Sequence, residues 1–192
     1  MTKPEKIFDG LLVLQYRKGS KKALSLLVKR WHIKFCKHGY YYVKDREVAK
    51  DIAQDSWRVI LKSIGKLEDV NSFGSWALVI VNRKAIDYLR KKQKTDGILH
   101  QYYETAKINY DTIETAYAIT NDRVFTNTEG TETIMSSIKK LPENQQIILR
   151  LFYLEEYSIL EICKILEISK GTVKSRLFYA REKLKLILKN KK

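Results

Sequence analysis

The chain has 192 residues, of which 44% are hydrophobic, so it can build folded cores and is too apolar for wholesale disorder. Its net charge of +15 favours a polyanionic partner, nucleic acid first and anionic membrane second, although a basic surface can also serve solubility alone. The N-terminal stretch MTKPEKIFDG lacks the apolar run of a signal peptide, and no stretch is long enough to span a membrane. The two cysteines form no CxxC motif, so we expect a cytoplasmic protein without disulfides.

The charge is distributed unevenly along the chain. Residues 1–94 carry a net charge of +13, residues 95–134 a net charge of −5, and residues 135–192 a net charge of +7. The acidic middle segment is rich in Thr and Asn and contains TNTEGTET, a poor core former. We therefore expect two domains, 1–94 and 132–192, joined by a flexible acidic linker at 95–131.

The periodicity of the apolar residues predicts an all-α protein. Only two prolines and eight glycines occur, apolar residues recur at helical spacing, and no sustained alternation of the strand type is present. The predicted helices span about 8–18, 21–40, 45–64 and 72–92 in the first domain, with a further helix near 110–120 in the linker. We expect three or four helices in the second domain.

The predicted helix at 45–64 has two contrasting faces. Its apolar face follows the three-and-four spacing of a single helical stripe and comprises Ala49, Ile52, Ala53, Ser56, Trp57 and Ile60. Its opposite face is acidic within a basic domain and comprises Glu47, Asp51, Gln54 and Asp55. A solvated helix face is the simplest interpretation of such charges, and a docking surface for a basic protein is the alternative.

Residues 142–184 have the pattern of a helix-turn-helix. Two apolar stripes, one ending at Leu166 and one beginning at Val173, flank a short turn at 167–169, and Ser169 can cap the second helix. The outward residues of that second helix are Lys174, Ser175, Phe178, Tyr179 and Arg181. These side chains supply cations for phosphates, donors for base edges and rings for apolar contact, as a major-groove helix requires. An ordinary helical hairpin with a basic face stays open at this point.

With these motifs, the chain resembles the extracytoplasmic-function sigma factors, the small two-domain class of the bacterial sigma-70 family. The resemblance covers residues 8–94 and 132–188. In the first domain it is carried by DREVAKDIAQDSWRVI and FGSWALVIVNRKAIDYLRKK, and in the second by LPENQQIILRLFYLEEYSILEICKILEISKGTVKSRLFYAREKL. A helix-turn-helix alone is shared by many regulators, whereas the two domains in this order and spacing are specific.

The resemblance implies a role for each surface of the first domain. The helix at 45–64 would dock on a coiled coil of the polymerase β′ subunit through Asp51, Gln54 and Asp55. The stretch 66–72 and the following helix would recognise and melt the minus-ten promoter element. Melting requires rings for stacking, neutral hydrogen-bonding groups for base edges and cations for phosphates. The matching residues are Asn71, Ser72, Phe73, Trp76, Asn82, Arg83, Arg90 and Lys91. For Trp76, a place in the core is an equally good prediction.

The resemblance also implies that the second helix of the helix-turn-helix reads the minus-thirty-five element. The matching positions are Thr172, Lys174, Ser175, Arg176, Phe178, Tyr179 and Arg181. The acidic linker resembles the family's interdomain connector, which passes through polymerase channels that otherwise hold nucleic acid. Its negative charges would there imitate a phosphate backbone.

Two residues depart from the family's pattern. Arg83 stands where an asparagine is common, and Asn82 lies one position early, which turns its side chain by about 100° around the helix. The base-specific contact at minus ten could therefore come from either residue. Glu167 stands in the turn of the helix-turn-helix where glycine is frequent, so we expect a strained or altered turn.

The sequence therefore predicts a transcription initiation factor that binds core RNA polymerase through its β′ and β subunits and binds promoter DNA. An anti-sigma factor is an expected partner, and neither membrane insertion nor a cofactor is expected. His32, Cys36 and His38 match no zinc pattern, and no catalytic cluster is apparent, so we expect no metal and no enzyme. The alternatives are a DNA-binding regulator that acts without polymerase, a nucleic-acid-processing enzyme and a membrane-surface protein.

Overall fold

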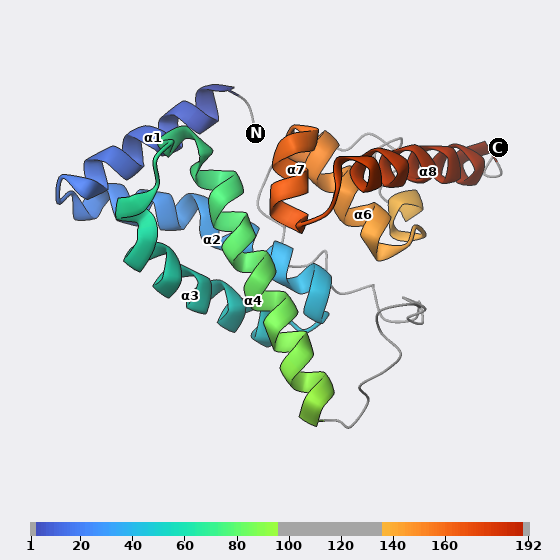
Figure 1. Ribbon diagram of the computed structural model, residues 1–192, viewed down its shortest axis with the longest axis horizontal. Coiled ribbons are helices and arrows are strands. Elements are labelled where there is room, and N and C mark those ends of the chain that lie inside the picture. Colours follow the sequence, from blue (N-terminus) through green and yellow to red (C-terminus); the bar gives the residue numbers. More distant parts are fainter. Residues whose placement is uncertain (1–2, 96–135, 190–192) are drawn as a thin grey trace.

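The computed structural model describes residues 3–95 and 136–189, and every regular element within these ranges is helical (Figure 1). The predicted all-α class is thus confirmed. The acidic linker and the helix predicted near 110–120 lie outside the described residues.

The first group of helices follows the predicted order closely. Its elements are α1 (Lys3–Arg17), α2 (Lys21–Val43), α3 (Arg46–Ser63), the 3₁₀ turns η1 (Ile64–Lys66) and η2 (Val70–Ser72), and α4 (Phe73–Thr95). Helix α1 begins five residues before the predicted start at 8, and the other three helices agree with the prediction to within three residues at each end. Side-chain caps explain two of the starts: Ser20 accepts from the Ala23 N–H, and Asp45 accepts from the Glu47 and Val48 N–H groups.

The second group comprises α6 (Glu143–Leu149), the π-helical segment η4 (Arg150–Leu154), α7 (Ile159–Leu166) and α8 (Lys170–Lys189). Helix α7 begins with a capping box, in which Ser158 and Glu161 each accept from the other's backbone N–H. Its apolar residue Ile162 packs with Ile165 and, from α8, with Val173, Leu177 and Ala180 in a buried core. The predicted helix-turn-helix is confirmed.

An aromatic cluster forms the centre of the first domain. The rings of Trp31, Phe35, Trp57 and Phe73 come from α2, α3 and α4, and neighbouring centroids lie 5.0–5.7 Å apart along the chain Trp57–Phe35–Trp31–Phe73. These offset and edge contacts are the arrangements that aromatic quadrupoles favour. The buried carboxylate of Asp9 ties α1 to this cluster, because it accepts a 3.0 Å hydrogen bond from Trp31 Nε1.

The two domains pack against each other along α4, with α7 of the second domain beside it (Figure 1). The closest approach is at Gly74 near the start of α4. A Cβ atom at this position would collide with the Trp31 ring and lie 3.0 Å from the Tyr157 hydroxyl oxygen. Tyr157 precedes α7 and is itself buried, so a residue of each domain meets at this glycine.

Replacing Gly74 by alanine tests this close approach. We expect Gly74→Ala to lower the free energy of unfolding by about 1–3 kcal/mol, because an added methyl group overpacks a filled site. Urea denaturation followed by tryptophan fluorescence measures the change. Gly65→Ala is the matched control, since a Cβ there meets no described atom within 4 Å, and it should shift stability by about 0.5 kcal/mol or less. Equal stabilities of the two variants would contradict the packing.

Candidate nucleic-acid interface

The acidic face of α3 is open to solvent. Asp51, Gln54 and Asp55 are all exposed on the side of α3 opposite the buried stripe. The Asp55 carboxylate accepts a 2.6 Å hydrogen bond from Arg58 one turn later, and both side chains are at least half exposed. The face is therefore a solvated, negatively charged surface that a basic partner could approach without rearrangement of the helix.

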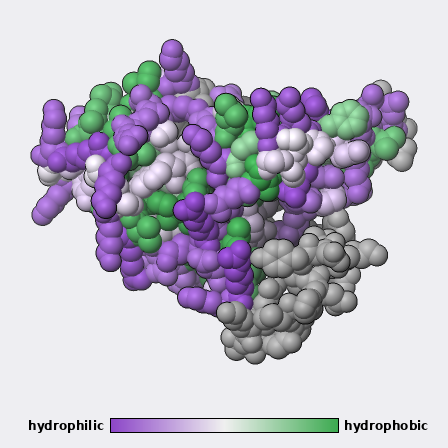
Figure 2. Space-filling view, viewed as in Figure 1, coloured by the Kyte–Doolittle hydropathy of each residue, from purple (hydrophilic) through white to green (hydrophobic). Residues whose placement is uncertain are grey.

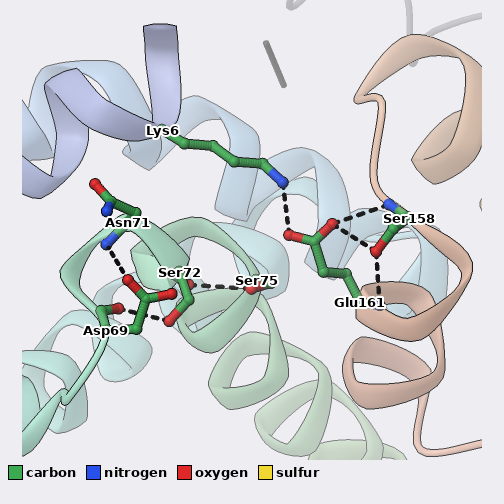
Figure 3. Close-up of polar contacts among 7 residues, drawn as sticks. All are labelled: Lys6, Asp69, Asn71, Ser72, Ser75, Ser158 and Glu161. Atoms are coloured by element: carbon green, nitrogen blue, oxygen red, sulfur yellow. Dashed lines mark hydrogen bonds and ion pairs between the residues drawn. The ribbon is translucent and has the colours of Figure 1, made fainter. Parts of the chain in front are cut away.

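The segment before α4 is held in a defined shape by short-range hydrogen bonds. Asp69 accepts from the Asn71 N–H at 3.0 Å, Ser72 Oγ donates to the Asp69 carbonyl at 2.6 Å, and Ser75 Oγ donates to the Ser72 carbonyl at 3.0 Å (Figure 3). Arg17 of α1 holds the turn that precedes this segment, because its guanidinium donates to the Ile64 carbonyl. Asn71 is left exposed and Ser72 half-buried, as neutral groups that could reach a base edge.

The side chains predicted to contact the minus-ten element divide into exposed and buried ones. Arg83, Arg90 and Lys91 are exposed along α4, and Trp76 is half-buried against Phe73. Phe73 and Asn82, however, are 0% exposed. The Phe73 ring completes the aromatic core and Asn82 faces the inside of the molecule, so neither side chain is open to DNA in this arrangement, and their contact with the minus-ten element stays a prediction.

A shallow hollow of about 170 Å³ lies between α3 and α4. Val59 and Ile80 supply apolar lining, and Arg83, Lys84 and Asp87 supply charged groups. Apolar surface beside cations suits the flat face and the phosphate of a nucleotide, and Arg83 borders such a surface on α4.

The turn of the helix-turn-helix has the strained backbone that the sequence indicated. Glu167 adopts the left-handed conformation with φ 56° and ψ 41°, and its N–H closes α7 by donating to the Cys163 carbonyl. Ser169 then begins α8, since its Oγ accepts from the Thr172 N–H at 3.1 Å and contacts the Thr172 hydroxyl at 2.8 Å. Thr172 is thus already engaged in the cap, and its hydroxyl stays near the helix N-terminus.

Helix α8 presents most of its predicted DNA-contacting residues to solvent. The exposed ones are Lys174, Ser175, Phe178, Tyr179 and Arg181. Arg176 is half-buried and interacts electrostatically with Tyr42 of α2. Burial raises the pKa of the Tyr42 phenol, and the positive charge of Arg176 acts in the opposite direction. Arg176 therefore lies near the first domain and is less open to solvent than its neighbours Lys174 and Ser175.

Ion pairs across the domain boundary were not predictable from any local motif. Lys6 Nζ lies 2.7 Å from Glu161, Lys44 Nζ lies 2.9 Å from Glu143, and Arg83 binds Glu167. The partners in these pairs are separated by 84 to 155 residues in the sequence, so only the folded structure brings them together.

A second cross-boundary contact involves the largely buried Arg150 of η4. Its guanidinium pairs with Glu155 at 2.8 Å and covers the Tyr41 ring of α2 at 4.8 Å from the centroid. A cation over an aromatic face is favourable when it is shielded from water. Arg150 therefore fixes the end of α2 to the second domain.

Comparison with known proteins follows the same division of the chain. Models of sigma-70 region 2 and sigma-70 region 4 match residues 27–95 and 131–184. The chain belongs to the sigma-70 family, in its extracytoplasmic-function group. The sigma factor is 29% identical over 185 residues to the ECF RNA polymerase sigma factor SigW of Bacillus subtilis, covering 93% of this chain and 95% of that protein. It is also 29% identical to the ECF RNA polymerase sigma-E factor of Haemophilus influenzae, over 93% and 94% of the two chains.

Solved structures share the fold of this sigma factor. CnrH in complex with the cytosolic domain of CnrY aligns with a TM-score of 0.59 at 18% identity, over 96% of this chain and 99% of that one. RpoE in complex with the anti-sigma factor NepR from Bartonella quintana aligns with a TM-score of 0.60 at 17% identity, over 88% and 98%. The family consists of transcription initiation factors, so this chain is a promoter-specific initiation factor of RNA polymerase and not a regulator that acts alone.

Within residues 3–95 and 136–189, no set of three or more His, Cys, Asp and Glu side chains is arranged to hold a metal ion. The contact of His32 with Cys36, 3.6 Å between Nε2 and Sγ, is a pair without further ligands in that part of the chain. None of the described helices is long and apolar enough to cross a membrane.

His38 lies buried at the end of α2 that faces the second domain. Burial, and after it the positive charge of Arg150, lowers the pKa of His38 from 6.5 to about 3. Asn82 faces the imidazole but falls short of a regular hydrogen bond, and neither His38 Nε2 nor the Asn82 amide has a partner among the described residues. The neutral imidazole is therefore required for this packing.

Because of His38, the stability of the protein should decrease as the pH is lowered below about 6.5. Between pH 6.5 and about 3 the unfolded chain binds a proton at His38 and the folded protein does not, so its contribution is complete above pH 6.5 and is lost as pH falls. We expect the difference in unfolding free energy between wild type and His38→Gln to change by up to about 1.4 kcal/mol per pH unit in this window. Urea titrations at pH 7, 6, 5 and 4 measure it. His32→Gln is the control, and parallel pH profiles for wild type and His38→Gln would contradict the assignment.

Proposed function

We propose that this sigma factor binds core RNA polymerase through α3 and positions α4 and α8 on the minus-ten and minus-thirty-five elements of bacterial promoters. The observation that carries this proposal is the arrangement of surfaces on one chain: an exposed acidic face on α3, exposed cations along α4, and an exposed basic recognition helix. Such a factor acts where the chromosome is transcribed, in the bacterial cytoplasm. The β′ and β subunits of the polymerase are the proposed protein contacts.

The acidic face of α3 suits a protein partner better than DNA. Phosphates would be repelled by Asp51 and Asp55, whereas a basic helix of polymerase would be attracted to them. Gln54, between the two carboxylates on the same exposed face, can donate and accept hydrogen bonds with such a partner. We assign docking on the β′ coiled coil to this surface.

The residues of α4 and the preceding turn are assigned to the minus-ten element. Asn71 and Ser72 offer neutral hydrogen-bonding groups, Trp76 offers a half-exposed ring, and Arg83 borders the apolar hollow beside α3. Arg90 and Lys91 continue the cationic path along α4 to the phosphates. Asn82 and Phe73 belong to this site only if the surrounding packing opens.

The proposed boundaries follow the family models and the charges. We assign residues 1–94 to region 2, 132–192 to region 4, and 95–131 to an acidic connector. Of the two solved structures with this fold, one is CnrH in complex with the cytosolic domain of CnrY, and the other is the sigma factor RpoE in complex with the anti-sigma factor NepR. By analogy, we propose that an anti-sigma factor holds this protein inactive until a signal releases it.

Run-off transcription tests the function directly. Purified core polymerase and a pool of promoters should yield new start sites when the sigma factor is added, and none should appear with core enzyme alone. Binding to duplex DNA without any initiation would instead support a regulator that acts without polymerase.

Charge reversal on α3 tests the polymerase contact. We expect Asp51→Lys combined with Asp55→Lys to weaken assembly with core polymerase by about tenfold or more, because two attractive charges become repulsive. Gel filtration or fluorescence anisotropy with labelled protein measures the affinity. Glu182→Lys in the second domain is the control, since this exposed glutamate lies on α8. Unchanged assembly of the α3 variant would remove this role.

Lys174→Ala tests the contact of α8 with phosphate. Loss of one phosphate cation should reduce the magnitude of the slope of log K against log salt by about 0.9 and weaken all sequences alike. Binding of the holoenzyme to a promoter fragment at several salt concentrations measures this slope. Lys62→Ala is the control, because Lys62 is exposed on α3, away from α8. The same slope in wild type and Lys174→Ala would exclude the contact.

A further inference from the structure

The two residues that depart from the family's pattern are bonded to each other. Arg83 Nε and Nη2 both donate to Glu167 Oε1, at 2.8 and 2.6 Å, although the residues are 84 positions apart in the chain. Arg83 lies on α4 of the first domain, and Glu167 lies in the turn between α7 and α8 of the second. The two residues that differ from the family's pattern therefore carry opposite charges and form a pair with each other.

The left-handed backbone conformation of Glu167 is unfavourable for a glutamate, so the needs of the turn alone do not explain this residue. Its left-handed conformation is one that glycine adopts without strain and that disfavours a residue with a Cβ atom. A glutamate here strains the turn and, in exchange, places a carboxylate beside Arg83. The local strain and the contact across the domains thus have one common explanation.

The Arg83–Glu167 pair is part of a consistent set. Lys6 of α1 donates to Glu161 at 2.7 Å, and Glu161 at the same time closes the capping box of α7 with Ser158 (Figure 3). Lys44 pairs with Glu143 at the far end of the boundary. In all three pairs the cation comes from the first domain and the carboxylate from the second, so the charges favour one mutual orientation of the domains.

The closed arrangement occupies groups that promoter DNA would need. Arg83 borders the hollow between α3 and α4, and its charge is neutralised by Glu167. Its neighbour Asn82 is fully buried with both amide atoms unpaired among the described residues. On the other domain, Arg176 of α8 faces Tyr42.

We propose that Arg83 and Glu167 form an intramolecular latch that holds the two domains closed and masks the DNA-binding face of α4. The closure stands on the contacts themselves, whereas the masking rests on the proposed role of α4. Polyanionic DNA competes with Glu167 for Arg83, and salt screens the pair, because the two side chains are 63% and 44% exposed. Opening frees Arg83 and separates the turn of the helix-turn-helix from α4.

Single-molecule energy transfer measures closure without polymerase or a promoter. Dyes are placed on cysteines substituted for the exposed Lys62 of α3 and Lys185 of α8, in a Cys36→Ser, Cys163→Ala background. We expect Glu167→Lys and Arg83→Glu each to reduce the ratio of closed to open molecules by about fivefold or more, since an attraction becomes a repulsion. The double variant, with the charges exchanged, should return to within about twofold of the parent.

Glu167→Gly separates the latch from folding. It removes both the strain and the carboxylate, so the melting temperature of the second domain should stay the same or rise while the closed fraction falls about two- to fivefold. Glu182→Lys changes the charge of α8 away from Arg83 and should leave the closed fraction unaltered. An unaltered closed fraction in Glu167→Gly, or failure of the charge exchange to restore closure, overturns the latch.

Binding of a fluorescein-labelled 20-nucleotide single-stranded DNA tests the masking separately. Glu167→Gly should bind this probe about two- to fivefold more tightly than the parent if closure hides α4. Looser domains without tighter binding would overturn the masking and retain the latch. Failure of run-off transcription would count against the proposed function alone, because neither the energy-transfer nor the DNA-binding measurement uses polymerase.

Discussion

The close approach at Gly74 is the constraint on which the arrangement of the molecule depends. Because this position has no side chain, the Trp31 ring from the aromatic core and the Tyr157 hydroxyl from the second domain can both reach the backbone of α4. One helix is thereby packed on two sides, and the core of the first domain directly supports the surface on which the second domain rests. Desolvation at this contact raises the pKa of Tyr157, so the phenol stays neutral and can remain buried.

The charges of the molecule are arranged around this contact. The chain carries a large positive excess, yet acidic side chains line the outer face of α3, and three others pair with cations across the boundary between the domains. The space-filling view shows hydrophilic residues covering most of the visible face, with apolar groups in separate patches (Figure 2). The carboxylates at the boundary neutralise cations of the first domain. Those on the outer face of α3 are exposed and remain available to a partner.

The sequence predicted elements well where local physics determines them. Ser20, Asp45 and Ser158 mark helix starts because their side chains satisfy N–H groups of the first turn. The resemblance assigned Phe73 and Asn82 to the minus-ten surface, but a family motif does not tell which side of α4 faces the core, and both side chains are buried in the structure. The π-helical segment η4 had no sequence signal either.

The contacts between the domains lay beyond prediction for a different reason. A salt bridge such as Lys6–Glu161 joins residues 155 positions apart, and neither residue has a neighbour in sequence that marks it. The one available signal was the departure of Arg83 and Glu167 from the family's pattern, which indicated altered chemistry at each position separately. Only the structure shows that the two departures compensate each other.

The composition of the boundary suits two domains that must part. Exposed ion pairs contribute about 0–1 kcal/mol each and are weakened by salt, so Arg83–Glu167 fixes orientation more than it adds stability. Tyr157 and Arg150 lie in the shielded part of the contact, and each is a polar side chain that water can solvate after separation. A boundary made only of aliphatic side chains would expose a large apolar face on opening. Shielded polar groups and exposed ion pairs at the boundary therefore allow the closed form to be specific while limiting the apolar surface that opening exposes.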